Sequence, residues 1–475
     1  MKRINILLMN CALFLGITSC SLDSEVYQYK DSDAAFTTLK DVANGMNGAY
    51  YALGSYRFLG NYAVAFGDMS AGICKGSASS GHFYSVSNYT ISDTDAEIED
   101  AWQYGYQVID RTTRTIIGAK NMEGALSEDD KSTADNYIGQ CYALRALANY
   151  YLVNLYSLPY SAGTDNPGIV LVVDKPIEAF ETITRSTVGE TYTQILDDIA
   201  TAEALLKATD DPGIFYMNVG AVEALKTRVY LSMGDYDKAK MAALAAIQWR
   251  GSGDGTGDDT SLSNADYLAM WRSISEEKNE EIFSIKKSAD DNLSANALNT
   301  LYGSYYGTVT NSMRAYFDET DIRMELMAFS SQAGGYQPLK YPGITGAAAV
   351  SNIRIFRKSE MSLALAEIYA RQNDVANAQK YLMYTAKRNS VYADGSRVLP
   401  ATKEALLRFI SEERIREFFA EGHCFYDARR MGDLVNSDSY QNFDIKKFVF
   451  PIPAAEVNSG SGVTQNTDWF KNLPE

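Results

Sequence analysis

The chain has 475 residues, of which 46% are hydrophobic and 22% charged, so its composition is that of a globular protein rather than a disordered or multi-span membrane protein. The net charge of −17 argues against a nucleic-acid partner, because a duplex-binding surface needs clustered positive charge. His82 and His423 are its only two histidines, which excludes a three-histidine zinc site. Tyrosine is the compositional outlier, with 33 residues.

Residues 1–19 are predicted to be a signal peptide. Lys2 and Arg3 precede a mostly apolar stretch at 4–17, which is too short to span a bilayer. It ends in Ile17-Thr18-Ser19-Cys20, which resembles a bacterial lipobox, with an ordinary secretory signal as the alternative. We therefore expect Cys20 to carry the lipid, including palmitate, and residues 20–35 to form a flexible tether. The acidic residues that follow Cys20 resemble surface-export signals of some Gram-negative lipoproteins.

Two segments, 221–248 and 361–385, share one helical-hairpin pattern. Gly234 and Asn373 stand where a helix ends in a left-handed residue, which glycine and asparagine tolerate best. An aspartate follows each of them and is the predicted N-cap of the next helix. Small alanines four residues further on let the two helices approach closely. These units resemble tetratricopeptide repeats.

The repeats do not run in tandem, as they would in a simple scaffolding solenoid with a period of about 34 residues. We therefore expect a mainly α fold with little β structure, in which tetratricopeptide-like hairpins form a frame that carries long loop insertions. Residues 36–475 would form one domain. The Gly/Asp-rich segment 251–260 has no EF-hand spacing, so we expect a solvated loop there and no metal site. The loop-rich segments are 67–96, 157–185, 251–266 and 329–352.

The C-terminal third carries a recognisable order of motifs, and two shorter motifs lie near the N-terminus. The set resembles the SusD/RagB family of outer-membrane nutrient-binding lipoproteins, and together with the lipobox it covers nearly the whole mature chain. No single motif is decisive, but the order is specific. The motifs are Asp68-Met69, the segment 102–117, the segment 353–361, Glu412-Glu413-Arg414, Glu421-Gly422-His423, Asp427-Ala428-Arg429-Arg430 and Pro451-Ile452-Pro453.

The resemblance implies a SusD-like helical fold and a non-catalytic role without a cofactor. It implies capture of an oligosaccharide, or sometimes a peptide, and delivery to a SusC-like TonB-dependent transporter. It also implies a lipid-anchored place at the cell outer membrane, facing the exterior. In this family the ligand contacts vary with the glycan, so the resemblance indicates their location only weakly.

Aromatic residues in two loops are the candidate ligand contacts. A sugar's apolar face stacks on an aromatic ring, while its hydroxyls need planar polar partners. Asn88 and Asn311 lie nearby in sequence and could supply such amides. The alternative for each aromatic side chain is loop packing. The candidates are His82, Phe83, Tyr84 and Tyr89 in the segment 81–90, and Tyr302, Tyr305 and Tyr306 in the segment 301–307.

Two other functional classes remain as alternatives: a surface glycoside hydrolase and a protein-binding repeat scaffold. Hydrolysis needs two carboxyl groups across a cleft, whereas Glu413, Glu417 and Glu421 lie on one helix face. We therefore expect these glutamates to stabilise the helix through ion pairs. His423 has no partner histidine near it in sequence, so we expect a structural histidine and no catalytic residue. The long loops argue against a pure scaffold.

Overall fold

The computed structural model describes residues 35–474, apart from residues 123, 125, 179, 252, 273–279 and 344–348. The predicted signal peptide, Cys20 and all but the last residue of the predicted tether lie outside the described residues. None of the helices within the described part of the chain is long and apolar enough to cross a membrane.

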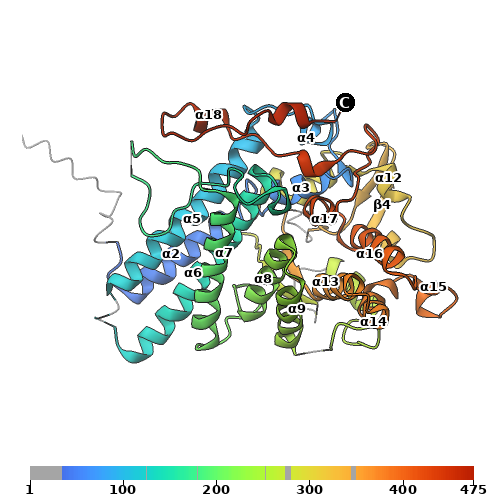
Figure 1. The fold of residues 1–475 in the computed structure, drawn as a ribbon, viewed down its shortest axis with the longest axis horizontal. Helices are drawn as coiled ribbons and strands as arrows, with labels where there is room; N and C mark the ends of the chain where they lie inside the picture. Colours follow the sequence, from blue (N-terminus) through green and yellow to red (C-terminus); the bar gives the residue numbers. More distant parts are fainter. Residues whose placement is uncertain are drawn as a thin grey trace, which may run out of the picture.

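The fold is mainly α-helical with three short strand pairs, as the sequence predicts (Figure 1). The long helices stand together at one end, and the helical hairpins follow toward the other end. The main helices are α2 (Leu39–Leu53), α5 (Ala96–Met122), α6 (Glu128–Tyr156), α7 (Val188–Lys207), α8 (Val219–Met233), α9 (Tyr236–Arg250), α13 (Lys358–Arg371), α14 (Val375–Ala386), α16 (Lys403–Phe418) and α17 (Cys424–Met431). The shorter helices are α3 (Tyr62–Met69), α4 (Tyr84–Ser87), α10 (Asn264–Arg272), α11 (Leu298–Tyr302), α12 (Asn311–Arg314), α15 (Ser390–Ala393) and α18 (Ala454–Val457).

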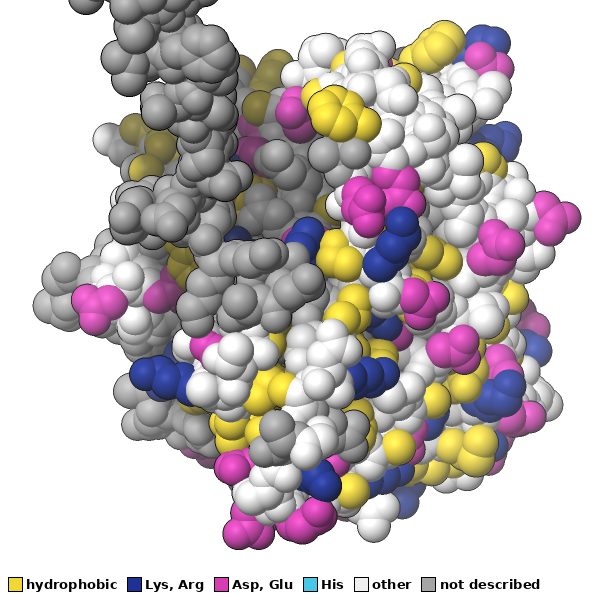
Figure 2. All heavy atoms as spheres, turned by 90° about the vertical axis from the view of Figure 1, so that its left-hand side faces the viewer, with side chains coloured by type: hydrophobic (Ala, Val, Ile, Leu, Met, Phe, Trp, Pro, Cys, Tyr) yellow, Lys and Arg dark blue, Asp and Glu magenta, His cyan; other side chains and the backbone are white. Residues whose placement is uncertain are grey.

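The strand pairs are all antiparallel. They join β1 (Cys74–Lys75) to β3 (Thr308–Val309), β2 (Glu281–Ile285) to β6 (Ile353–Arg357), and β4 (Met327–Ser330) to β5 (Gly335–Pro338). The largest cluster of buried hydrophobic residues runs from Val42 to Val463 in sequence, and a second cluster holds buried residues of α13, α14 and α16. On the end face formed by the long helices, acidic and basic side chains are interspersed with hydrophobic ones (Figure 2).

Both predicted helical hairpins are present. Gly234 ends α8 with φ of 78°, and Asn373 follows α13 with φ of 63°. The carboxylates of Asp235 and Asp374 then accept the backbone N–H three residues further on, at 3.2 Å and 3.1 Å. These are the N-caps expected from the sequence. Local residue chemistry therefore determines where α8 and α13 end and where α9 and α14 begin.

Most described residues of the Gly/Asp-rich segment are exposed, as expected of a solvated loop, but residues 255, 256 and 259 are buried. Asp259 is only 4% exposed. It accepts hydrogen bonds from the backbone N–H groups of Gly255 and Ser261, both at 2.8 Å, and lies 3.3 Å from the Lys358 ammonium. A buried lysine thus supplies the positive charge that the carboxylate needs. Among the described residues, no cluster of three or more His, Cys, Asp or Glu side chains could hold a metal ion.

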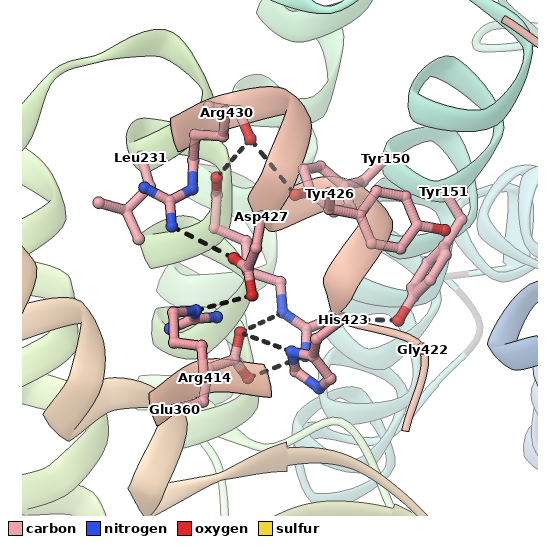
Figure 3. Close-up of a pocket in the computed structure, with 12 residues that line it drawn as sticks. Tyr150, Tyr151, Leu231, Glu360, Arg414, Gly422, His423, Tyr426, Asp427 and Arg430 are labelled. Carbon is pink, nitrogen blue, oxygen red and sulfur yellow. Dashed lines mark hydrogen bonds and ion pairs between the residues drawn. The ribbon is translucent and has the colours of Figure 1, made fainter. Parts of the chain in front are cut away.

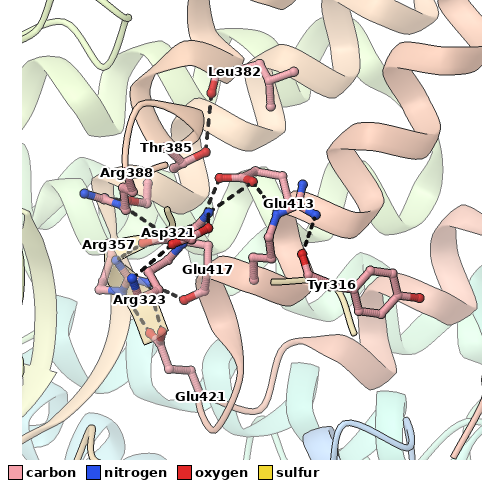
Figure 4. Close-up of polar contacts among 12 residues, drawn as sticks. Tyr316, Asp321, Arg323, Arg357, Leu382, Thr385, Arg388, Glu413, Glu417 and Glu421 are labelled. Carbon is pink, nitrogen blue, oxygen red and sulfur yellow. Dashed lines mark hydrogen bonds and ion pairs between the residues drawn. The ribbon is translucent and has the colours of Figure 1, made fainter. Parts of the chain in front are cut away.

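A buried ionic network joins α16 to the elements around it (Figure 4). Arg323 lies 2.8 Å from Glu413 on α16, and Arg357 on β6 lies 3.0 Å from Glu417 and 2.8 Å from Glu421. The three glutamates are therefore structural, as the sequence predicts, but the expectation that all three lie on one helix face is wrong, because α16 ends at Phe418 and Glu421 follows it. The network contains the carboxylates of Glu280, Asp321, Glu413, Glu417 and Glu421, and the cations of Arg323, Lys340, Arg357, Arg388 and Arg416.

Glu417 is the centre of this network, because three arginines reach its two carboxylate oxygens. Burial by itself would raise the pKa of Glu417, but Arg388, Arg357 and Arg323 outweigh it and hold that pKa well below its usual range. The carboxylate is therefore ionised in the folded protein. Removing one partner of a buried ion pair leaves an uncompensated charge in a low-dielectric environment, which is strongly destabilising.

We predict that Glu417→Gln lowers the free energy of unfolding by about 3–5 kcal/mol at pH 7, as judged by urea denaturation. Since the folded-state pKa is depressed, the stabilisation by Glu417 is fully present above about pH 5 and declines as the pH falls below the unfolded-state value of about 4.3. The difference between the variant and the wild-type protein should therefore shrink in acid.

Glu404→Gln is the matched control for this prediction, because Glu404 is exposed in the first turn of the same helix. Its free energy of unfolding should change by no more than about 0.5 kcal/mol. Equal urea midpoints for wild type and Glu417→Gln would contradict the central role of Glu417.

Candidate functional site

A two-residue strand pair brings together the two aromatic loops that the sequence singles out. Cys74 pairs with Val309 and Lys75 with Thr308. The Thr310 N–H and hydroxyl extend this ladder by donating to the carbonyls of residues 73 and 72, at 3.0 Å and 2.6 Å. The loop that follows β1 and the loop that precedes β3 therefore lie side by side, although more than 200 residues separate them in the chain.

A groove of about 260 Å³ opens between these loops, and we call it the polar groove. A third segment, 437–439, closes one side of it. The Lys75 ammonium lies 2.5 Å from an Asp438 carboxylate oxygen, and the other oxygen of Asp438 accepts the Asn311 N–H at 2.9 Å. The hydroxyl of Ser439 donates to the Asn88 side-chain oxygen at 3.0 Å. These contacts anchor the third segment to both loops.

Of the seven candidate residues, Tyr84 and Tyr306 line the polar groove. Tyr84 is 42% exposed, and Tyr306 is half-buried. Neither ring packs against another aromatic ring of the described residues, and each ring has accessible surface on which a ligand could stack. Asn88 also lines the groove, and its side-chain N–H donates to the Tyr84 carbonyl at 2.8 Å. Asn311 is exposed beside it.

His82 and Tyr305 contact each other across the two loops. Their rings stack on each other, with centroids 4.1 Å apart and planes inclined by 15°, and neither residue lines the polar groove. This contact joins the two loops across the base of the β1–β3 pair. Both side chains thus hold the loops in register and present at most their outer faces to a ligand.

Phe83, Tyr89 and Tyr302 are buried to at least 96% and belong to the core. Phe83 packs edge-on against Tyr62 at 5.2 Å. Tyr89 meets three other aromatic rings at about 5 Å, and its hydroxyl donates to the Ser70 carbonyl. The expectation that these three rings face ligand is therefore corrected, because packing already occupies their surfaces.

Three residues of the two aromatic loops have a strained backbone. Phe83, Tyr89 and Tyr306 have φ values of 53°, 53° and 60°, in the left-handed region that bulky residues rarely adopt. Each such residue costs about 1–3 kcal/mol and persists only where the surrounding structure enforces it. At Tyr306 the enforcing contacts are backbone bonds of the tight turn, including its N–H to the Gly303 carbonyl at 3.0 Å. The strain places the Tyr306 ring at the groove.

The polar groove is close to electrically neutral, in contrast to the acidic chain as a whole. Among the described residues that line it, Lys75 is the one basic residue and Asp438 the one acidic residue, and their charges neutralise each other. Hydroxyl and amide groups supply most of the remaining polar atoms. Such a surface suits an uncharged, hydroxyl-rich ligand, because it offers ring faces and hydrogen bonds without a charge that must be matched.

A second pocket surrounds His423, but it is an enclosed structural pocket of about 30 Å³, which is room for about one water molecule (Figure 3). Arg228 lies 2.6 Å from Glu360 there. Burial and the charges of Arg228 and Arg414 hold the pKa of His423 well below its usual range, so its ring stays neutral at physiological pH. It also stacks on Phe418 at 4.4 Å.

Sequence reasoning missed Lys75, Asp438 and Ser439. Lys75 and Asp438 are 363 residues apart, and no local pattern connects them. The polar composition of the segment around Asp438 signals a loop, but it does not say which loop it contacts. Only the packed frame brings these residues together.

Two family models match the chain. One, described as starch-binding and associating with the outer membrane, covers residues 22–231, and the other, described as the SusD family, covers residues 282–469. The SusD-like protein P2 of Formosa agariphila is 26% identical over 240 residues, which are 50% of this chain and 44% of that protein. The match therefore spans less than half the length of that relative.

Solved structures share the fold. A SusD superfamily protein from Bacteroides thetaiotaomicron has a TM-score of 0.79 at 23% identity, covering 90% of this chain and 100% of the other. A SusD-like carbohydrate-binding protein from Bacteroides vulgatus has a TM-score of 0.70 at 19% identity, covering 85% of this chain and 86% of the other. At these identities the similarity establishes the architecture.

The neighbouring residues Phe83 and Tyr84 give a direct test of the geometry. We predict that Phe83→Ala lowers the free energy of unfolding by about 3–5 kcal/mol, because it empties a packed core position. Tyr84→Ala should change it by less than about 0.5 kcal/mol, because the side chain is largely exposed. Equal thermal shifts for the two variants would contradict the assigned orientations.

Proposed function

The chain belongs to the SusD/RagB family, and from that premise we propose that it is a cell-surface nutrient-binding lipoprotein that captures an oligosaccharide in the polar groove. We further propose that it hands the ligand unaltered to a SusC-like TonB-dependent transporter in the outer membrane. Residues 20–35 would tether the single folded domain, 36–475, to the membrane through a lipid on Cys20, so that the domain faces the exterior.

The observation that carries the ligand assignment is the pair of partly exposed tyrosine rings, Tyr84 and Tyr306. They come from two different loops and line one neutral groove with hydroxyl and amide groups between them. A sugar ring has apolar C–H faces and polar edges, so stacking and hydrogen bonding complement it together. The carbohydrate-binding relative from Bacteroides vulgatus supports the same ligand class.

Different observations support the proposed membrane anchor and the proposed delivery of ligand to a transporter. The family description places such proteins in association with the outer membrane. The residues Ile17-Thr18-Ser19-Cys20 fit a lipobox, and two or more acyl chains hold a protein stably on a membrane. The transporter partnership follows from family membership alone.

A glycoside hydrolase is the main alternative, and the groove argues against it. Retaining and inverting enzymes use two carboxyl groups about 5–10 Å apart across the scissile bond. Asp438 is the only carboxylate among the residues that line the polar groove, and Lys75 is paired with it. Incubation of the purified protein with the glycans that it binds should therefore release no product, and turnover would contradict pure binding.

We predict that Tyr84→Ala and Tyr306→Ala each weaken oligosaccharide binding about three- to tenfold. Each variant removes one stacking face, worth about 0.5–1.5 kcal/mol. The measurement is calorimetry with the tightest-binding glycan from a screened panel.

Tyr51→Ala is the matched control for these variants, because Tyr51 is a 65%-exposed tyrosine on α2. It lies outside both aromatic loops and does not line the polar groove. This variant should leave the affinity unchanged. Wild-type affinity in the Tyr84→Ala, Tyr306→Ala double variant would exclude the polar groove as the glycan site.

We predict that Cys20→Ala moves the protein from the membrane fraction to the soluble fraction, because the thiol that carries the acyl chains is lost. The measurements are fractionation of cells and the mass of the mature N-terminal peptide. Unchanged membrane association, with no acyl mass on the wild-type peptide, would contradict the lipid assignment.

A further inference from the structure

A second groove, of about 540 Å³, lies between the first half of α5, residues 170–178 and 180–183, and the residues around α18. This region is at the upper left of Figure 1. We call it the acidic groove. It shares no lining residue with the polar groove, and its volume lies in the range of pockets that bind organic ligands.

Backbone contacts fix the walls of the acidic groove. The Tyr106 hydroxyl on α5 accepts the Val170 N–H at 2.8 Å and donates to its carbonyl at 3.1 Å. The Ile183 N–H donates to the Ser461 carbonyl at 2.7 Å. The N–H of residue 454, at the start of α18, donates to the carbonyl of residue 93 just before α5 at 2.8 Å. The groove is therefore preformed rather than assembled by its ligand.

Apolar side chains form part of the walls of the acidic groove. Trp102 is only 4% exposed, because its ring packs against Tyr106 at 4.8 Å and Tyr156 at 5.0 Å. The faces of the Trp102 ring are therefore not offered to a ligand. The accessible apolar surface of the groove comes from Ile177, Ile183 and the fully exposed Phe180 on the rim. Exposed apolar surface of this kind is typical of interaction sites.

The charge of the acidic groove is one-sided. Glu99, Glu178, Glu181 and Glu456 line it, and no lysine or arginine does. Lys175 neutralises Glu181 at 2.9 Å. Within the described part of the chain, no cation lies within ion-pair distance of the other three carboxylates. A positively charged group that entered the groove would relieve their mutual repulsion.

We propose that the acidic groove binds a short peptide segment in which lysine or arginine stands beside aliphatic or aromatic residues. The carboxylates would receive the cation, and the aliphatic walls would receive the neighbouring apolar side chains. The chain's own segment 21–34 has four acidic residues and one basic residue, so like charge disfavours it as the occupant. This activity is independent of glycan capture in the polar groove.

The test uses the mature chain and two acetylated, amidated pentapeptides, Leu-Lys-Leu-Arg-Leu and Leu-Glu-Leu-Glu-Leu, in calorimetric titrations. The basic peptide should bind, with an affinity that falls as salt is added, and the acidic peptide should not. Equal binding of both peptides, or no binding of the basic peptide at millimolar concentration, would overturn the proposal.

Variants locate the site. The Glu99→Gln, Glu456→Gln double variant should lower the affinity for the basic peptide about three- to thirtyfold. Phe180→Ala should also lower this affinity, without unfolding the chain. The Glu319→Gln, Glu404→Gln variant makes the same change in net charge at exposed positions elsewhere and should retain wild-type affinity. An equal loss in both double variants would overturn the assignment to this groove.

The glycan site and the peptide site can be tested independently of each other. The Tyr84→Ala, Tyr306→Ala variant should bind the basic peptide normally, and the Glu99→Gln, Glu456→Gln variant should bind glycan normally. Loss of both ligands in either variant would overturn the independence of the acidic groove.

Discussion

The ionised carboxylate of Glu417 is the constraint on which the rest of the structure depends. It is buried at the centre of a network that joins α16, β6, the segment 321–323 and the end of α14. One turn further on, the chain passes Glu421 and reaches Gly422, whose N–H donates to Asp68 on α3 at 2.6 Å. A Cβ atom on Gly422 would lie 2.8 Å from the α3 backbone, so only glycine fits there. Through α3 and β1, this contact fixes one wall of the polar groove.

The frame could be predicted from the sequence because its signals are local. Helix ends at Gly234 and Asn373, and N-caps one residue later, depend on residues within one turn of each other. The structural role of Glu413 and Glu417 was also predicted from their spacing, but their partners were not, since Arg323 and Arg357 come from other elements. The same limit explains the Gly/Asp-rich segment, where Lys358, about 100 residues away, pairs with the buried Asp259 of an otherwise mostly exposed loop.

The candidate site could be predicted only to the level of its loops. Aromatic residues in polar loops identified both segments, yet the adjacent Phe83 and Tyr84 point in opposite directions, one into the core and one into the groove. Tertiary packing decides that difference, and no periodicity in a short irregular loop encodes it. The two grooves themselves differ in chemistry: one is neutral with two partly exposed tyrosines, and the other is acidic with apolar walls. A protein built in this way can discriminate between ligands without altering them.

The left-handed backbone at Tyr306 has a consequence for how the binding surface can change. Glycine would relax the turn at this position, so a substitution that gains stability would erase a ring that faces the groove. Rigidity and recognition thus compete at a single residue. Engineers who wish to retune ligand preference would do better to exchange the side chain of Tyr84, which adopts ordinary helical geometry at the start of α4, and leave the strained turn opposite it untouched.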